Sequence, residues 1–189
     1  MKILSLLGSP RKGNSEILLT YASNLCKEKG HEVLNINPSH MQISGCVACD
    51  ACSETGKCVV EDDMNVIYPL LEEADRVIIV SPIFFFGLPA QLKSLIDRCQ
   101  CLWYEKYVLK KRASLKKRKA LLILVGGMKK GEIGVTCAEA TIKAFLRTID
   151  VGEHKTLSYL GYNEAGEILK NEKAFADIVL AVDELLKND

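Results

Sequence analysis

Five short aliphatic runs, separated by stretches with helical periodicity, constrain the fold of this 189-residue chain more than any other feature. Near-continuous Val, Ile and Leu in such runs is typical of strands that are buried on both faces. Between the runs, apolar residues recur three or four positions apart, as in amphipathic helices. The pattern therefore predicts a parallel sheet covered by helices on both sides. The predicted strands span residues 2–8, 31–37, 76–82, 119–127 and 154–161.

The alternation of these elements fits a flavodoxin-like, doubly wound sheet of five parallel strands in the order 2-1-3-4-5. Hydrophobic residues make up 48% of the chain, enough for one core, and we expect a single domain over residues 1–189. In this fold class, ligands bind beyond the carboxyl ends of the strands, beside strand one. The loops at 8–15, 82–89 and 126–134 are therefore the expected site. We expect helices over residues 15–30, 61–74, 88–103, 135–150 and 171–187.

Charge and hydropathy exclude several other classes of protein. A net charge of +1 does not indicate a nucleic-acid binder, and no apolar run has the length of a membrane span. The opening MKILSLLG is too short for a signal peptide, and GSPRKG follows where a cleavage site would lie. We therefore expect a cytoplasmic protein, in which thiols stay reduced and structural disulfides are disfavoured.

The loop GSPRKGNS, residues 8–15, is a candidate phosphate site. It resembles a phosphate-binding P-loop, but Asn14 stands where the lysine that contacts β- and γ-phosphates would be, so we expect a monophosphate. Backbone N–H groups at the start of the next helix would bind it. The alternative is an ordinary helix cap formed by Asn14 or Ser15, beside a surface arginine. The candidate binding residues are Ser9, Arg11, Gly13, Asn14 and Ser15.

The loop after the third strand favours a flat aromatic ligand. Phe84, Phe85 and Phe86 are consecutive, so they cannot all face one core, and at least one should line a pocket or an interface. Pro82 and Gly87 allow a shaped loop around them. The alternative is a strand end followed by core aromatics. Gly126 and Gly127 could form a third side of the site.

The segment GCVACDACSETGKC contains Cys46, Cys49, Cys52 and Cys58 in the spacing C-x2-C-x2-C-x5-C. The first three match the opening run of bacterial ferredoxins, and Gly56 could bend the chain so that the fourth reaches a [4Fe–4S] cluster. Zinc, redox-active thiols and an unmetallated loop remain alternatives. Residues 45–60 would form an insertion after the second strand.

The other cysteines fall on or beside apolar stripes. Cys26, Cys99 and Cys137 lie on predicted buried helix faces, and Cys101 lies off its stripe and is unassigned. The predicted stripe of Cys137 also contains Thr141, Ala144, Phe145 and Thr148.

The run at residues 106–119 holds eight Lys or Arg. It is either a solvated connection or a docking patch for an acidic electron carrier.

Several segments together resemble the iron–sulfur flavoprotein family, a branch of the flavodoxin-like, NADPH-dependent FMN reductase superfamily. They are LLGSPRKGNSEILL, GCVACDACSETGKCVVEDDM, SPIFFFGLPAQLKSLIDR and CLWYEKYVLKK, and the resemblance runs from residue 3 to about residue 150. It implies FMN and one [4Fe–4S] cluster per subunit, in a homodimer or homotetramer. The implied cluster ligands are Cys46, Cys49, Cys52 and Cys58. The implied FMN contacts are Ser9, Arg11, Asn14 and Ser15 for the phosphate, and Pro82, Ile83, Phe84, Phe85 and Gly87 for the flavin.

The function that this resemblance implies is electron transfer between a one-electron carrier such as ferredoxin and an acceptor. One alternative is an NAD(P)H-dependent FMN or quinone reductase without a cluster, and a second is a redox or metal sensor that acts through partner binding. The three histidines are scattered, outside the predicted ligand loops, so no catalytic acid or base is assigned.

Overall fold

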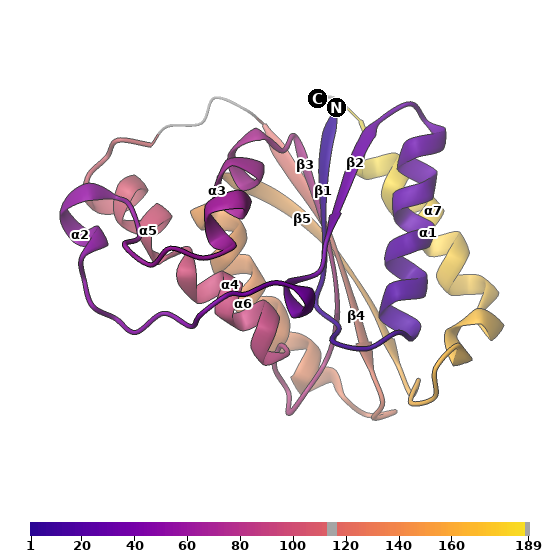
Figure 1. Cartoon of the computed structure of the whole chain (residues 1–189). Coiled ribbons are helices and arrows are strands. Elements are labelled where there is room, and N and C mark those ends of the chain that lie inside the picture. The colour runs from indigo at the N-terminus through magenta and orange to yellow at the C-terminus, as the bar shows by residue number, and fades with distance from the viewer. Residues whose placement is uncertain (113–116, 188–189) are drawn as a thin grey trace.

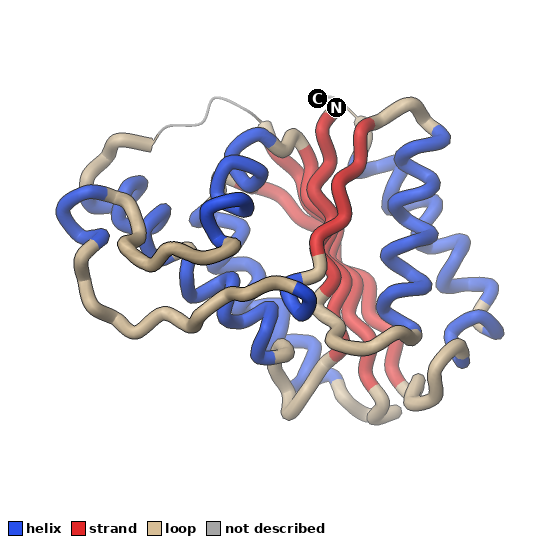
Figure 2. Tube along the Cα trace, in the orientation of Figure 1, coloured by secondary structure: helices blue, strands red, loops and turns tan. Residues whose placement is uncertain are grey.

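The five strands form one parallel sheet in the predicted order. The structure is a computed structural model that describes residues 1–112 and 117–187. Its sheet runs β2-β1-β3-β4-β5, and every neighbouring pair is parallel (Figures 1 and 2). The strands are β1 (Lys2–Leu7), β2 (Glu32–Ile36), β3 (Arg76–Pro82), β4 (Arg118–Gly126) and β5 (Val151–Leu160).

Helices cover both faces of this sheet (Figure 1). On one face lie α1 (Asn14–Glu28) and α7 (Glu172–Leu185), and on the other α3 (Met64–Glu73), α4 (Ala90–Arg98) and α6 (Glu132–Thr148). Beyond the second layer, at the left of Figure 1, lie the short helices α2 (Cys52–Thr55) and α5 (Gln100–Trp103). A π-helical turn η2 (Tyr104–Val108) follows α5, and the 3-10 turns are η1 (Pro38–His40) and η3 (Glu167–Lys170). No helix in the described ranges has the length and apolar character needed to cross a bilayer.

Each face of the sheet has its own apolar core, because successive side chains of a strand point to opposite sides. In β1, Leu4 and Leu6 belong to the core under α3, α4 and α6, whereas Ile3 and Leu7 belong to the core under α1 and α7. Burial of each such side chain contributes about 1.5–3 kcal/mol. Because the strands are packed on both faces, the loops that follow them start from fixed positions at one edge of the sheet.

The predicted helix over residues 88–103 is interrupted. Cys99 (φ −75°, ψ 8°) ends α4, and α5 starts again one residue later. The break shifts the helical phase, so Cys101 is buried although it lies off the predicted stripe, while Trp103 is exposed. Cys26 and Cys99 are buried as predicted.

The predicted buried face of the next helix is only partly correct. Phe145 and Thr148 of α6 are buried as predicted, but Cys137 and Ala144 are exposed. The rest of the buried face consists of Ala138, Ile142 and Leu146, so the helix is rotated toward its larger aliphatic side chains.

Candidate functional site

A cavity of about 390 Å³ lies where the loops after β1, β3 and β4 meet. It brings together eight of the residues predicted to bind a cofactor. They are Ser9, Arg11, Gly13, Asn14, Ser15, Pro82, Ile83 and Phe84.

The chain segment after β5 also lines this cavity, through Tyr162 and Asn163, and sequence reasoning missed it. The sequence could have predicted this contribution, because the fifth strand ends at the same edge of the parallel sheet and is followed by a polar segment. Gly127, predicted as part of a third side, lines the cavity as well, together with Met128 of the predicted 126–134 loop. Val125, at the end of β4, is a further lining residue that was not predicted.

The start of α1 is open to an anion. Gly13 precedes the helix, and no side chain caps it, so the predicted cap by Asn14 or Ser15 is wrong. The first N–H groups of a helix have no partner within the helix, and they carry its positive dipole end. Gly8 lets the loop lie close to β3, because a Cβ there would come within 2.6 Å of Ser81 Oγ.

The Asn14 side chain holds the cavity together instead of capping the helix. Its Nδ2 donates to the Glu164 carbonyl at 2.8 Å, and its Oδ1 accepts the Ile168 N–H at 3.2 Å. These bonds fasten the segment after β5 to the first loop. Ser15 is buried, and its hydroxyl makes no hydrogen bond to any described residue, so it is available to a ligand.

The loop after β3 is a tight, strained turn. Phe84 and Gly87 exchange backbone hydrogen bonds of 3.0 and 2.8 Å, and the central residues Phe85 and Phe86 have φ values of 47° and 60°. This left-handed conformation costs roughly 1–2 kcal/mol for a residue other than glycine. Strain of this kind is concentrated at functional sites.

The three phenylalanines are exposed, and Phe85 is fully so, which rules out the alternative that they belong to the core. Phe84 lines the 390 Å³ cavity, whereas Phe85 and Phe86 line an adjoining apolar cavity of about 250 Å³. Gly126 lies in that second cavity as well. Of the predicted cofactor residues, Gly87 lines neither cavity; it closes the turn.

The four cysteines of the C-x2-C-x2-C-x5-C segment line one small cavity of about 30 Å³, together with Cys101 and Arg98. The bend predicted at Gly56 is present, with φ 77°, and Ala48 and Asp50 also take left-handed conformations between the cysteines. Burial and the neighbouring Cys101 thiol raise the pKa of Cys52. Within residues 1–112 and 117–187, no three or more His, Cys, Asp or Glu side chains lie close enough together to hold one metal ion.

A buried ion pair between Arg98 and Asp62 joins the two ends of the cysteine segment. Arg98 Nη1 lies 2.5 Å from Asp62 Oδ2 and 3.1 Å from the Ser44 carbonyl, and Nη2 donates to the Val60 carbonyl at 3.0 Å. Burial opposes the charge on Asp62, but the hydrogen bonds from Arg98 and from backbone N–H groups lower its pKa overall. Removing one partner of such a pair costs about 3–5 kcal/mol.

The cysteine cavity and the 390 Å³ cavity share no lining residue. The segment after β2 leaves the sheet at the predicted edge, where Asn37 Nδ2 donates to the Ser9 carbonyl at 3.2 Å. It then crosses the α3 and α4 layer and carries the cysteines away from that edge (Figure 1). Within one chain the cysteine cavity and the 390 Å³ cavity are therefore separate sites.

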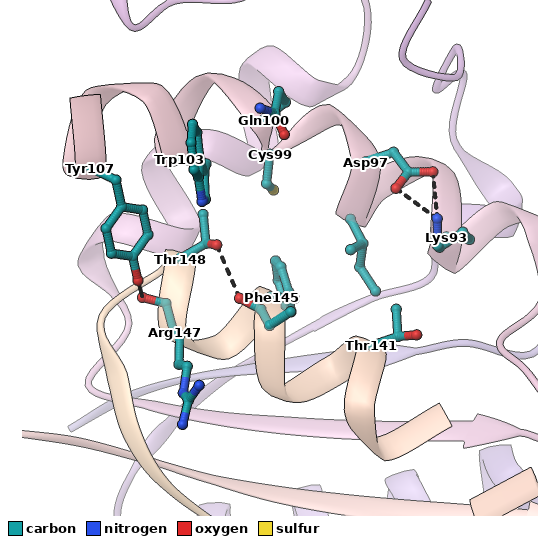
Figure 3. A pocket seen from close by; sticks show the side chains of 12 residues that line it. Lys93, Asp97, Cys99, Gln100, Trp103, Tyr107, Thr141, Phe145, Arg147 and Thr148 are labelled. Atoms are coloured by element: carbon teal, nitrogen blue, oxygen red, sulfur yellow. Dashed lines mark hydrogen bonds and ion pairs between the residues drawn. The ribbon is translucent and has the colours of Figure 1, made fainter. Parts of the chain in front are cut away.

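A groove of about 550 Å³ separates α4, α5 and η2 from α6 (Figure 3). Tyr107 spans it by donating to the Arg147 carbonyl at 3.4 Å, and its ring lies 5.6 Å from that of Trp103. The groove contains none of the predicted cofactor or metal residues.

The basic run at residues 106–119 is partly used inside the molecule. Lys106 and Arg112 bind Asp150 at 2.7 and 3.0 Å, and Arg118 is buried against the carbonyls of Leu71 and Ile149. Lys116 lies outside the described residues. The run is therefore in part a structural connection, and fewer of its charges can act as a docking patch.

Comparisons with known proteins agree with this architecture. Residues 1–159 match the family described as NADPH-dependent FMN reductase. An iron–sulfur flavoprotein of Methanosarcina thermophila is 37% identical over 69% of this chain and 66% of its own length. Another, of Methanocaldococcus jannaschii, is 36% identical over 77% of this chain and 70% of its own. Among solved structures, an NAD(P)H:quinone oxidoreductase from Methanothermobacter marburgensis has a TM-score of 0.78 at 16% identity, with 100% of this chain and 98% of that chain covered.

The fold and the family match together place the chain in a class of flavin-dependent oxidoreductases, the NADPH-dependent FMN reductase family. Within that class, the chain belongs to the iron–sulfur flavoproteins of the NADPH-dependent FMN reductase family. The aligned segments span between 45% and 70% of the length of the first four relatives.

Proposed function

We propose that this protein transfers electrons between a one-electron carrier such as ferredoxin and an acceptor, using FMN and a [4Fe–4S] cluster. The observation that carries the proposal is that four cysteines with cluster spacing line one cavity in a chain that also has an open helix start at the sheet edge. The relatives that carry the name iron–sulfur flavoprotein support it. The cytoplasmic, reducing location expected from the sequence is part of this proposal.

The chain's residues fit FMN in the 390 Å³ cavity. The uncapped N–H groups of α1 and the Ser15 hydroxyl would bind the phosphate, and Arg11 would add a charged hydrogen bond. Ile83, Phe84 and Met128 would exclude water from the flavin ring. Bound FMN supplies one- and two-electron chemistry, while the protein sets orientation and access.

The cysteine cavity fits an iron–sulfur cluster by the chemistry of its donors. Thiolates are the usual ligands of such clusters, and four thiolates that bind four separate irons need not converge on one point. Cys46, Cys49, Cys52 and Cys58 would be the ligands. A bound cluster supplies one-electron transfer.

We include a homodimer or homotetramer in the proposal. Phe85, Phe86, Met128 and Ile133 are exposed apolar side chains near the flavin edge, and exposed patches of this kind mark interaction surfaces. A second copy would cover them and could bring its cysteine cavity toward this chain's flavin cavity.

Anaerobic purification, followed by a visible spectrum and by iron, sulfide, zinc and flavin analysis, tests the proposed function. We expect one FMN with about four irons and four sulfides per chain. Cys49→Ser should lose the iron and keep the FMN, and Cys137→Ser, an exposed cysteine on α6, is the matched control that should keep both. Zinc, or flavin without any metal, would overturn the proposal.

The second candidate is an NAD(P)H-dependent quinone reductase without a cluster. The apolar 250 Å³ cavity beside the flavin cavity favours it, because its side chains, which include Ile83, Phe86 and Leu160, suit an uncharged ring. Rapid NAD(P)H oxidation with a quinone by iron-free protein would support this candidate.

A further inference from the structure

Arg98 is a buried arginine whose hydrogen-bond donors are not all used. Its side chain is 1% exposed, and both of its Nη groups bind oxygen atoms of Asp62, Ser44 or Val60. Its Nε has no hydrogen-bond partner among residues 1–112 and 117–187. Buried donors are almost always paired in folded proteins, so an unpaired one calls for an explanation, and a binding partner is one explanation where the surroundings supply it.

The place of Arg98 in the fold identifies that partner. Arg98 ends α4 and lines the same small cavity as the four cysteines. Of the described residues that line this cavity, it is the one with a positive charge; the others are thiols, apolar side chains, Gln100 and Asp50. An acceptor that enters the cavity would therefore meet sulfur ligands and this guanidinium.

We propose that Arg98 is a positioning residue of the iron–sulfur site, whose Nε–H donates to a sulfur atom of the bound cluster and whose charge raises the cluster's reduction potential. This inference rests on the proposed function. Reduction adds one electron from the carrier and so increases the negative charge on the cluster. A fixed donor and a nearby cation stabilise that reduced form more than the oxidised one.

Arg98 also fixes the conformation of the segment that contains the cysteines. Arg98 binds the carbonyls of Ser44 and Val60, on either side of the cysteines, and Asp62 accepts the Ser44 N–H at 2.9 Å. One guanidinium thus holds both ends of the ligand segment, while its Nε–H makes no hydrogen bond to the described residues.

Arg118 provides a matched control. It is also buried, its Nε also has no partner, and its Nη groups bind backbone carbonyls. It does not line the cysteine cavity. Arg118→Lys therefore tests the effect of altering a buried arginine that is not at the cluster.

The experiment is an EPR-monitored redox titration of the cluster in anaerobically purified wild type, Arg98→Lys, Asp62→Asn and Arg118→Lys. Arg98→Lys keeps the charge and removes Nε–H, so we expect about tenfold less reduced cluster at a fixed potential, a shift of ~59 mV to more negative values. Asp62→Asn keeps Arg98 and removes its counter-charge, so the potential should become more positive. Arg118→Lys should keep the wild-type potential.

The outcomes separate the two proposals. Wild type without iron would overturn the proposed function itself. Loaded wild type with unchanged potentials in Arg98→Lys and Asp62→Asn would overturn only the inference about Arg98. If Arg98→Lys fails to load, the shift in Asp62→Asn decides the question. Arg98→Lys and Asp62→Asn could both fold but contain no iron, while Arg118→Lys contains the cluster. That result would show that Arg98 only holds the loop together, and it would overturn its role in setting the reduction potential of the cluster.

Discussion

At the scale of single residues, Asn14 and Ser15 are neighbours in the first turn of α1 with different roles. Asn14 forms two hydrogen bonds that fasten residues 164–168 to the first loop, whereas the Ser15 hydroxyl has no partner among the described residues. Asn14→Ala should lower the free energy of unfolding of the flavin-free protein by about 1–3 kcal/mol, because it leaves the buried Ile168 N–H unpaired and removes the bond to the Glu164 carbonyl. Ser15→Ala should leave that stability within about 0.5 kcal/mol of wild type and weaken FMN binding by roughly tenfold.

Urea unfolding of the flavin-free variants and FMN titration by fluorescence measure the two effects separately. Equal losses of stability in both variants would contradict this division of roles.

The sequence predicts which residues line the flavin cavity better than it predicts what each one does. Eight predicted residues lie together there, because the carboxyl ends of parallel strands meet at one edge. The bonds of Asn14 could not be predicted, since they join residues 150 or more positions apart. Such long-range pairings depend on the packing of the finished fold.

At the scale of elements, the turn over residues 84–87 combines strain with exposure. Phe85 has φ 47° and a fully exposed side chain, so the side chain itself contributes little to the stability of the isolated chain. Phe85→Gly should relieve about 1–2 kcal/mol of backbone strain, less the 0.5–1 kcal/mol or so that glycine loses in conformational entropy. We expect a gain of roughly 0.5 kcal/mol in the free energy of unfolding, measured in urea.

The same substitution should weaken function, because strained residues are kept where a ligand or partner needs them. We expect a lower rate of electron transfer from the reduced flavin, or a looser oligomer by light scattering. A variant that is less stable than wild type in urea would show that the Phe85 side chain packs against this chain.

The strands were predicted well, because one pattern dominates each of them, whereas the helix over residues 88–103 was predicted less well. The strands are apolar over their whole length, and all five lie within three residues of their predicted ends. The helix over residues 88–103 has a single stripe in sequence, yet it breaks at Cys99 and turns Cys101 inward. Nothing in the local sequence marks this break, because no glycine or proline lies there.

At the scale of the whole molecule, charge is distributed so that little of it remains as one basic patch. The net charge is +1, and Lys106, Arg112 and Arg118 are engaged inside the chain. Electrostatic steering needs a surface of one sign. We therefore expect the rate of reduction by ferredoxin, measured by stopped flow, to change less than about threefold between roughly 0.05 and 0.5 M salt. A tenfold fall would contradict this and point to the exposed Lys110, Lys111 and Lys117 as the docking site.

Acid stability tests how the connection before β4 is held in the whole fold. Asp150, just before β5, binds Lys106 and Arg112, and although burial opposes its charge, these hydrogen bonds lower its pKa overall. Its folded-state pKa lies below the unfolded value, so its contribution to stability is complete above about pH 4 and is lost as the pH falls through the folded value.

Asp150→Asn should therefore destabilise the protein at neutral pH and reduce the slope of unfolding free energy against pH below about pH 4. Urea unfolding across this range measures the slope, and Asp177→Asn, which removes a surface pair with Lys173, should leave it nearly unchanged. An unchanged slope in Asp150→Asn would mean that Lys106 and Arg112 do not stabilise the charge of Asp150 in the folded protein.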